Sequence, residues 1–165
     1  MSVEDIKAIA RKSYNQMEGY DVIFIDYLQR IKLPGKNSVN KETGQAVNQL
    51  RDLAGEMNVP LVLLSQLNRS VQGRPTLANL RDSGEIEEAA DEVIFVYRED
   101  YDKEESEKEK YRQLAEMILA KGRTAGTGMF EMSFYPQITL WQDRRMEELG
   151  EEDKPEILTY KKTKV

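Results

Sequence analysis

Two polar residues that follow apolar runs have the side-chain types of a phosphate site. Asp26 ends the run Val22–Ile25, and Gln66 follows the run 59–65, VPLVLLS. A carboxylate at the end of an apolar strand is what a Mg²⁺–nucleotide site uses to hold the cation, often through water. A neutral amide beside it can orient a water molecule or contact a γ-phosphate without adding charge. For either residue alone, a turn cap at Asp26 or a backbone contact at Gln66 is the favoured interpretation, so the prediction of a phosphate site depends on the pair and its flanking residues.

The segment between these two runs indicates how they are arranged. Apolar residues recur at helical spacing from Thr43 to Met57. Two apolar strands joined by one helix form a βαβ unit, which implies parallel pairing with both faces covered. Ligands bind beyond the carboxyl ends of the strands in such a sheet. If the strands are neighbours, about 4.8 Å apart, Asp26 and Gln66 can share one site.

The flanking segments supply the remaining elements. We expect a first helix over 2–17, because Ser2 and Asp5 resemble a capping box and Ile6, Ile9 and Ala10 can share one face. Further along, the patterns predict a loop at 27–41, a short helix at 85–90, a charged solvated segment at 98–113, and strands at 91–97, 115–121, 128–135 and 137–141. The last two strands resemble an antiparallel hairpin closing the sheet edge.

The composition limits the chemistry available. The chain of 165 residues has no histidine and no cysteine, so any catalysis must use carboxylates, amides, lysines, arginines or a hard cation. The net charge of −6 argues against a broad basic face that coats nucleic acid, although a few arginines at one loop remain possible. There is no apolar run of membrane-spanning length and no secretion signal at the start, so we expect a cytoplasmic protein without a membrane partner.

Four segments together resemble a known family. DVIFIDYLQ, NVPLVLLSQLNRS, LRDSGEIEEAADEVIFVYR and ILAKGRTAGTG, in this order and spacing, are similar to segments of the DnaB-type replicative DNA helicases, which are hexameric RecA-like ATPases. The resemblance runs from about Ser2 to Trp141. It implies an α/β fold with an incomplete RecA-like, mostly parallel sheet flanked by helices and a C-terminal antiparallel hairpin. Residues 142–165 are expected to be a charged, mobile tail or a partner-binding segment.

The resemblance implies a nucleotide role for four residues. Asp26 resembles the Walker B aspartate that helps hold Mg²⁺, and Gln66 resembles the amide that links the γ-phosphate to the DNA loops. Lys121 and Arg123, in KGR, match the basic pair that reaches across a subunit interface to the ATP of the neighbour. Without that pattern, these two residues would fit a solvated turn between strands.

A further loop matches the part of the family that grips single-stranded DNA phosphates. It contains Arg81, Asp82 and Gly84, and the family more often has Glu where this chain has Asp82. Arg69, in QLNRS, could support the same loop. Arg81 could instead form a surface ion pair with Asp82 or Glu85.

The phosphate-binding half of such a motor is missing from the sequence. No G-x-x-x-x-G-K-[ST] motif occurs, and the Gly-Lys pair at Gly35 is followed by Asn37. In the family, the phosphate loop and the catalytic glutamate lie upstream of the segment where this chain begins. We therefore expect residues 1–141 to be a partial ATPase domain that does not hydrolyse ATP alone. We also expect an exposed or rearranged sheet edge beside the strand that ends near Gln66, which would be a site for dimerisation or aggregation.

Three interpretations remain open. The first is the C-terminal portion of a helicase motor, which in its complete form would use Mg²⁺ and ATP, bind single-stranded DNA and assemble as a ring hexamer. The second is a non-catalytic protein that joins or inhibits a full-length helicase ring. The third is a fragment of a RecA-like recombinase. Retention of Asp26, Gln66, Lys121 and Arg123 favours the first, because a pure binding module does not need a cation-binding aspartate.

Overall fold

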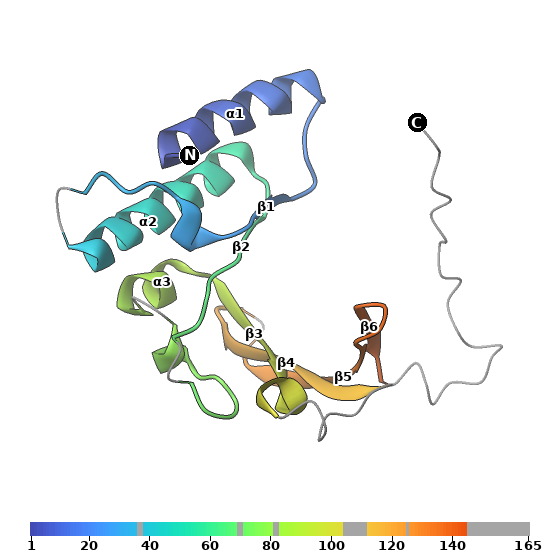
Figure 1. Ribbon diagram of the computed structural model, residues 1–165. Coiled ribbons are helices and arrows are strands. Elements are labelled where there is room, and N and C mark those ends of the chain that lie inside the picture. The colour runs from blue at the N-terminus through green and yellow to red at the C-terminus, as the bar shows by residue number, and fades with distance from the viewer. Residues whose placement is uncertain (36–37, 69–70, 81–82, 104–111, 125, 145–165) are drawn as a thin grey trace. The chain divides into compact units, whose positions relative to one another are not determined.

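Helices and short strands alternate along the first two thirds of the chain, and a run of longer strands follows (Figure 1). The computed structural model describes residues 1–144 apart from 36–37, 69–70, 81–82, 104–111 and 125. The elements are α1 (Val3–Gln16), β1 (Ile23–Ile25), η1 (Leu28–Arg30), α2 (Val39–Met57), β2 (Leu61–Leu63), η2 (Leu77–Asn79), α3 (Ser83–Ala89), β3 (Glu92–Arg98), η3 (Glu99–Asp102), β4 (Gln113–Gly122), β5 (Gly128–Tyr135) and β6 (Leu140–Asp143). The α/β class predicted from the sequence is confirmed.

Contacts along the chain divide it into two compact units. The first comprises Met1–Phe95 and Ile118–Gly128, and the second comprises Val96–Met117 and Met129–Val165. All the residues of the hydrophobic core cluster, which joins α1, α2, α3 and the strands β1 to β4, fall within the first unit. The candidate residues Asp26, Gln66, Lys121 and Arg123 also belong to this unit.

The N-terminal helix begins as the sequence predicts. The Ser2 hydroxyl accepts a hydrogen bond from the Asp5 backbone N–H at 3.2 Å, and Asp5 accepts one from the Ser2 backbone N–H at 2.8 Å. This capping box lowers the pKa of Asp5 below its usual value. Ile6 and Ala10 are buried, whereas Ile9, which the pattern places with them, is 57% exposed.

An exposed ion pair joins α1 to α2, which lie side by side in Figure 1. Arg11 on α1 donates two hydrogen bonds to the Glu56 carboxylate on α2, at 2.9 and 2.6 Å. These bonds lower the pKa of Glu56 below its ordinary value of 4.5 and raise the pKa of Arg11.

The βαβ unit predicted from the sequence is confirmed. β1 and β2 pair in parallel, with Ile23 opposite Leu61 and Ile25 opposite Leu63, and α2 connects them. Ile25, Leu61 and Leu63 pack against the core of buried side chains. Covering of both faces was expected, but the described residues cover only the inner face, and Phe24 and Val62 on the other face are exposed.

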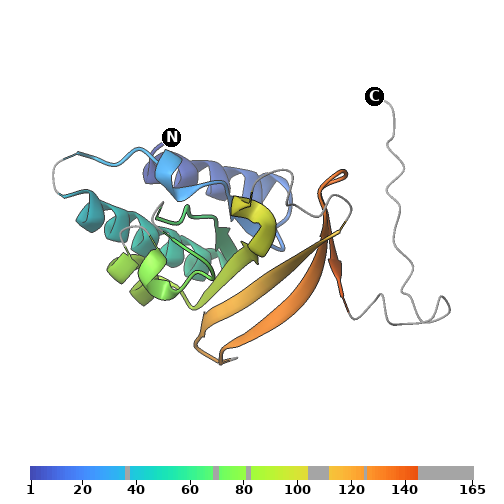
Figure 2. The same ribbon diagram turned by 60° about the horizontal axis from the view of Figure 1, so that its bottom comes forward.

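Among the described residues, the parallel pairing is confined to this two-stranded sheet, and β2 has no second strand partner. The edge beside the strand leading to Gln66 is therefore open, as the absence of a phosphate-loop segment predicts. β3 begins a separate four-stranded sheet of order β3-β4-β5-β6, in which β4 and β5 are long neighbouring strands (Figure 2).

The C-terminal hairpin in the second unit is also confirmed. β5 and β6 are antiparallel, and the rings of the paired residues Phe134 and Trp141 lie 4.9 Å apart between centroids. The guanidinium of Arg98 stacks on Phe134 at 4.2 Å from the ring centroid. β6 extends to Asp143, two residues past the predicted domain boundary at Trp141, and residues 145–165 of the predicted tail lie outside the described part.

Close packing of α2 against α3 fixes the position of the shorter helix. A Cβ atom added to the buried Gly44 on α2 would lie 2.5 Å from the Glu85 Cβ on α3. Glycine therefore permits an approach between the two helices that any larger residue would prevent.

No helix in the described ranges is long and apolar enough to cross a membrane.

Candidate functional site

The two residues of the predicted phosphate site lie together at the C-terminal ends of β1 and β2. Asp26 directly follows Ile25, which is opposite Leu63, and Gln66 lies three residues beyond Leu63. The Leu64 N–H donates to the Ile25 carbonyl at 3.0 Å, and the Leu28 N–H donates to the Leu64 carbonyl at 2.9 Å. Both candidate side chains are exposed at this edge, where a ligand can reach them. The peptide bond between Asp26 and Tyr27 is cis.

Gln29 joins the two strand ends and was missed in the sequence. Its side-chain amide donates to the Ser65 hydroxyl at 3.1 Å, and its amide oxygen accepts the Gln66 backbone N–H at 3.2 Å. The loop after β1 therefore holds the backbone of Gln66 and leaves the Gln66 side chain exposed. The segment DYLQ could have indicated this contact, because Gln29 follows Asp26 by three residues and its side-chain amide therefore lies in the first turn beyond the strand.

Asp26 can supply one ligand to a hard cation. Within the part of the chain that the structure describes, no group of three or more acidic, histidine or cysteine side chains is placed to hold a metal ion. Mg²⁺ normally keeps several waters and takes one or two carboxylates together with phosphate oxygens. The exposed Asp26 carboxylate fits that chemistry, whereas a dedicated protein cage for the ion is not formed by these residues.

The basic pair of the KGR segment lies against the C-terminal end of α3. The Lys121 ammonium donates to the Glu87 carbonyl and, at 2.8 Å, to the Ala90 carbonyl. Arg123 donates to the Glu88 carbonyl at 3.1 Å and forms an ion pair with Asp91 at 3.2 Å. The last carbonyls of a helix lack partners within the helix and carry partial negative charge, so both cations stabilise this end. The structure does place Arg123 in an exposed turn after β4, as the sequence alone would favour, and both cations also bond to the end of α3.

Two glycines build the turn that presents Arg123. A Cβ atom at Gly122 would overlap the carbonyl oxygen of Gly126, and Gly126 has a positive φ of 76°. Side chains at these positions would open the turn. The glycines of KGRTAGTG therefore allow the backbone at residue 122 to approach the backbone at residue 126 closely. The Arg123 N–H also donates to the Asp91 carbonyl at 3.0 Å, which fixes the turn to the residue before β3.

The predicted DNA loop, residues 81–84, is described only from Ser83, where α3 begins. Arg69, Arg81 and Asp82 lie outside the described residues. Gly84 is the second residue of α3, and a Cβ atom there would meet nothing within 4 Å. Gly84 thus lies at the N-terminal end of α3, and Lys121 and Arg123 bond to carbonyls at the C-terminal end of the same short helix.

Comparison with solved structures first defines the class of the fold. The chain superposes on a structure described as an ATPase domain with a TM-score of 0.76 and 32% identity, covering 87% of this chain and 51% of that chain. It also matches a DnaB-like replicative helicase, solved in a study of its interactions with primase, with a TM-score of 0.71 and 34% identity over 81% of this chain and 34% of that chain. The fold is therefore that of part of a RecA-like ATPase domain of the DnaB type.

Sequence comparison then identifies the family. Residues 1–143 match the DnaB-like helicase C terminal domain, and the chain belongs to that family. It is 39% identical over 138 residues to the replicative DNA helicase DnaB of Geobacillus stearothermophilus, covering 80% of this chain and 30% of the relative. It is 35% identical over 156 residues to the replicative DNA helicase DnaC of Bacillus subtilis (strain 168), covering 90% and 34%. The chain thus spans about a third of the length of these curated relatives.

Proposed function

We propose that this chain forms the C-terminal portion of a replicative DNA helicase motor, which couples ATP hydrolysis at subunit interfaces to movement along single-stranded DNA and duplex unwinding. The observation that carries the proposal is the parallel pairing of β1 and β2, which brings Asp26 and Gln66 to one edge of the sheet. Membership of the DnaB-like helicase family supports it.

The proposal gives each residue at the sheet edge a defined task. The Asp26 carboxylate would hold Mg²⁺, directly or through water, and the cation would neutralise charge on the β- and γ-phosphates of ATP. The Gln66 side chain would contact the γ-phosphate, while Gln29 holds the Gln66 backbone in place. The exposure of Asp26 and Gln66 supports these roles, because neither has to break an internal contact to meet a ligand.

The basic pair would act on the nucleotide of the neighbouring subunit in the ring. An arginine supplied in trans stabilises negative charge on the γ-phosphoryl group and makes hydrolysis depend on assembly. Lys121 and Arg123 would give up part of their bonding to the carbonyls of α3 to reach that nucleotide, because these bonds hold both side chains at the end of the helix. Arg81, Asp82 and Gly84, supported by Arg69, would bind DNA phosphates through backbone N–H groups and one charge-assisted bond.

The site in this chain is incomplete without a phosphate loop. The sequence contains no such motif, and the match covers only 51% of the solved ATPase domain. We therefore expect the purified chain to bind Mg²⁺–ATP too weakly to measure by calorimetry, and to show no turnover. An in-frame fusion to the preceding part of a DnaB-type ATPase domain should hydrolyse ATP, and DNA should stimulate it.

Titration of the purified chain and of its Asp26→Ala variant with Mg²⁺–ATP tests this proposal. Heat of binding that disappears in Asp26→Ala would show that the chain builds its own phosphate site, which contradicts the half-site argument. A fusion that binds a helicase ring but does not hydrolyse ATP with Asp26 intact would favour the non-catalytic interaction protein instead.

A further inference from the structure

Two arginines from different elements converge on one carboxylate oxygen at the junction between α3 and β3. Asp91 lies between the end of α3 at Ala89 and the start of β3 at Glu92. Arg123, in the turn after β4, approaches Asp91 Oδ1 with one guanidinium nitrogen at 3.2 Å. Arg51, on α2, approaches the same oxygen at 3.8 Å. The two cations therefore share a single anionic partner.

The two arginines are held by Asp91 to different degrees. Arg123 is the closer partner, and its backbone N–H also donates to the Asp91 carbonyl at 3.0 Å. Its second terminal nitrogen donates to the Glu88 carbonyl at 3.1 Å. Arg51 lies at ion-pair distance but beyond the length of a hydrogen bond. A small movement of its side chain would therefore let Arg51 bond to Asp91 directly once Arg123 moves away.

Both terminal nitrogens of Arg123 are occupied in this arrangement. A guanidinium binds phosphate through its N–H groups in a fixed fork, so contact with a neighbour's nucleotide would compete with these bonds. Departure of Arg123 would leave the Asp91 carboxylate beside Arg51. Because the carboxylate keeps a cationic partner, this departure costs less than the breaking of an isolated ion pair.

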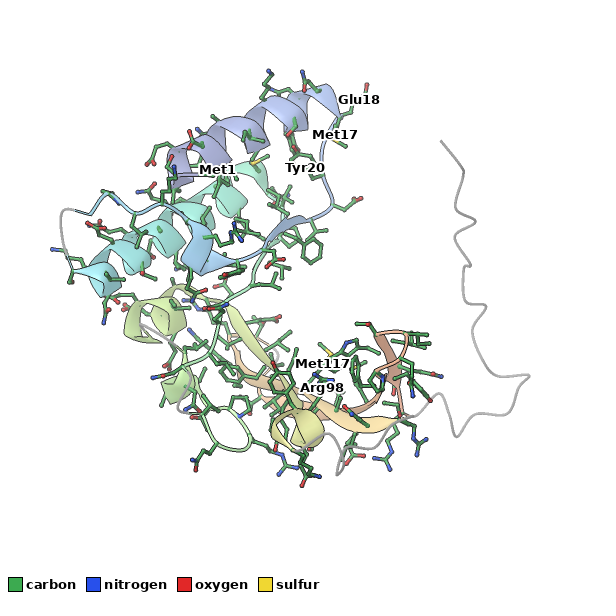
Figure 3. The ribbon with its side chains drawn as sticks, in the orientation of Figure 1. Met1, Met17, Glu18, Tyr20, Arg98 and Met117 are labelled. Atoms are coloured by element: carbon green, nitrogen blue, oxygen red, sulfur yellow. The ribbon has the colours of Figure 1, made fainter. Side chains whose placement is uncertain are left out.

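The position of Arg51 is set by the packing of α2 on α3. The two helices are neighbours in Figure 3. Gly44 on α2 admits Glu85 of α3 so closely that a Cβ atom at Gly44 would lie 2.5 Å from the Glu85 Cβ. Arg51 follows Gly44 by about two helical turns and so lies on the same side of α2. The close approach of the helices therefore directs Arg51 toward the end of α3.

We infer that Arg51 is a positioning residue for the reaction in trans, which takes the place of Arg123 on the Asp91 carboxylate when Arg123 moves to the nucleotide of the neighbouring subunit. This inference rests on the proposed function of Arg123. Arg51 touches no nucleotide in this scheme and acts only through the oxygen that it shares with Arg123. Loss of Arg51 should leave Arg123 held more firmly at the end of α3.

The size of the effect follows from the exposure of the three side chains. The exposed fractions are 45% for Arg51, 64% for Asp91 and 46% for Arg123. Water screens both ion pairs at this exposure, and an exposed pair changes an equilibrium constant by a factor of about 5 or less. We therefore expect changes of about 2- to 5-fold in the release of Arg123.

The first arm of the test uses the full 165-residue chain alone and requires no nucleotide. NMR of arginine side chains would measure rotation about the Cζ–Nη bonds of Arg123, which slows when these nitrogens are hydrogen-bonded. Arg51→Met should slow this rotation about 2- to 5-fold, whereas Asp91→Asn should accelerate it. Methionine is chosen because its helix propensity is close to that of arginine.

Arg11→Met is the matched control. Arg11 is 48% exposed, belongs to the same compact unit and forms an ion pair with Glu56. It lies on α1, which is on a different side of α2 from α3 (Figure 3). Rotation of the Arg123 guanidinium should therefore be unchanged in this variant. Circular dichroism would verify that each variant is folded, and Arg51→Gln serves in place of Arg51→Met if that variant is not.

The second arm uses the in-frame fusion to the preceding part of a DnaB-type ATPase domain, assembled as a ring. Arg51→Met should lower kcat for ATP hydrolysis about 2- to 5-fold and leave KM for ATP unchanged, because Arg123 acts on charge that develops in the transition state. Arg51→Lys keeps the positive charge and should restore most of the lost kcat. In an Asp91→Asn background, Arg51→Met should have no further effect, since the shared anion is gone.

Several results would overturn the inference. One is rotation of the Arg123 guanidinium that is the same with and without Arg51. Another is a loss of kcat that is equally large in the Asp91→Asn background or in Arg51→Lys, since Arg51 would then act by a route other than its charge at Asp91. A fusion that does not hydrolyse ATP, although Arg123 responds as expected in the chain alone, would contradict the proposed function alone. Hydrolysis that requires Arg123 but is insensitive to Arg51→Met would contradict the positioning role alone.

Discussion

Replacing Lys121 by methionine tests whether the basic pair has a structural role in addition to its proposed action on a neighbour's nucleotide. Methionine keeps an unbranched stem of similar length and removes the ammonium group that donates to the Glu87 and Ala90 carbonyls. A hydrogen bond to a charged group contributes about 1.5–3 kcal/mol net. Because Lys121 is only half-buried, water can replace part of this interaction. We therefore expect Lys121→Met to lower the free energy of unfolding of the first unit by about 1–3 kcal/mol.

The assay is urea unfolding of the chain, combined with hydrogen exchange at the C-terminal end of α3. Faster exchange at residues 87–90 would locate the loss at the helix end, where the capping bonds are made. Arg144→Ala is the control, because Arg144 pairs with Glu131 on the exposed surface of the other unit. A pair of that kind contributes about 0–1 kcal/mol.

Unchanged stability and unchanged exchange in Lys121→Met would refute the capping role. Under that result, Lys121 would be free to reach a neighbouring subunit at no cost to its own fold. Lower stability and faster exchange in Lys121→Met would instead show that Lys121 holds the end of α3. Movement of Lys121 toward a neighbour's phosphate would then loosen this helix, which carries Gly84 of the predicted DNA loop. Nucleotide contact at the subunit interface and the position of the DNA loop would be coupled through α3.

Three further predictions follow from the contacts described above. Gly44→Ala should destabilise the chain by about 1–2 kcal/mol, since the crowding against α3 outweighs the gain in helix propensity. A Cβ atom at Gly55 would meet nothing within 4 Å, so Gly55→Ala should stabilise the same helix by about 0.5–1 kcal/mol. Equal effects of the two substitutions in urea unfolding would contradict the close approach of Gly44 to α3. In fused, ring-forming proteins, mixing Asp26→Ala subunits with Arg123→Ala subunits should restore measurable ATP hydrolysis, because some interfaces regain both groups, and no recovery would exclude action in trans. The pKa of Glu56 measured by carboxyl NMR should lie below 4.5, so its stabilising contribution is present above that pH and is lost as the pH falls through the folded pKa. A value at or above 4.5 would show that the α1–α2 ion pair does not form in solution.

The sequence predicted those parts of the fold that depend on local patterns. The capping box at Ser2, the helical spacing after Thr43 and the apolar runs each determine an element through contacts that are close in sequence or periodic. The parallel pairing of β1 with β2 followed because a helix between two apolar strands leaves few other topologies. Placement of Asp26 and Gln66 at one sheet edge was a consequence of that pairing.

The parts that were missed depend on contacts between distant segments. The sequence could not show that Lys121 reaches the carbonyls of α3, since those carbonyls are more than thirty residues away and their availability depends on where the helix ends. The hydrogen bonds of Gln29 to Ser65 and Gln66 likewise join segments that are far apart in the sequence. The exposure of Ile9 and Phe24 was missed for another reason, because an apolar side chain predicts burial without specifying which chain covers it.

The incomplete sheet and the incomplete cation site have one physical origin. An aspartate at the end of a parallel strand can remain unpaired at little cost only when it is hydrated, and Asp26 is exposed in this chain. In the fusion proposed above, the preceding part of a DnaB-type ATPase domain would exclude water from this end of the sheet and bring new groups next to Asp26. Removal of water strengthens the attraction between the carboxylate and a cation, because the local dielectric constant falls. Affinity for Mg²⁺ should therefore be higher in the fusion than in the chain alone, and a fusion without any gain in Mg²⁺ affinity would contradict this argument.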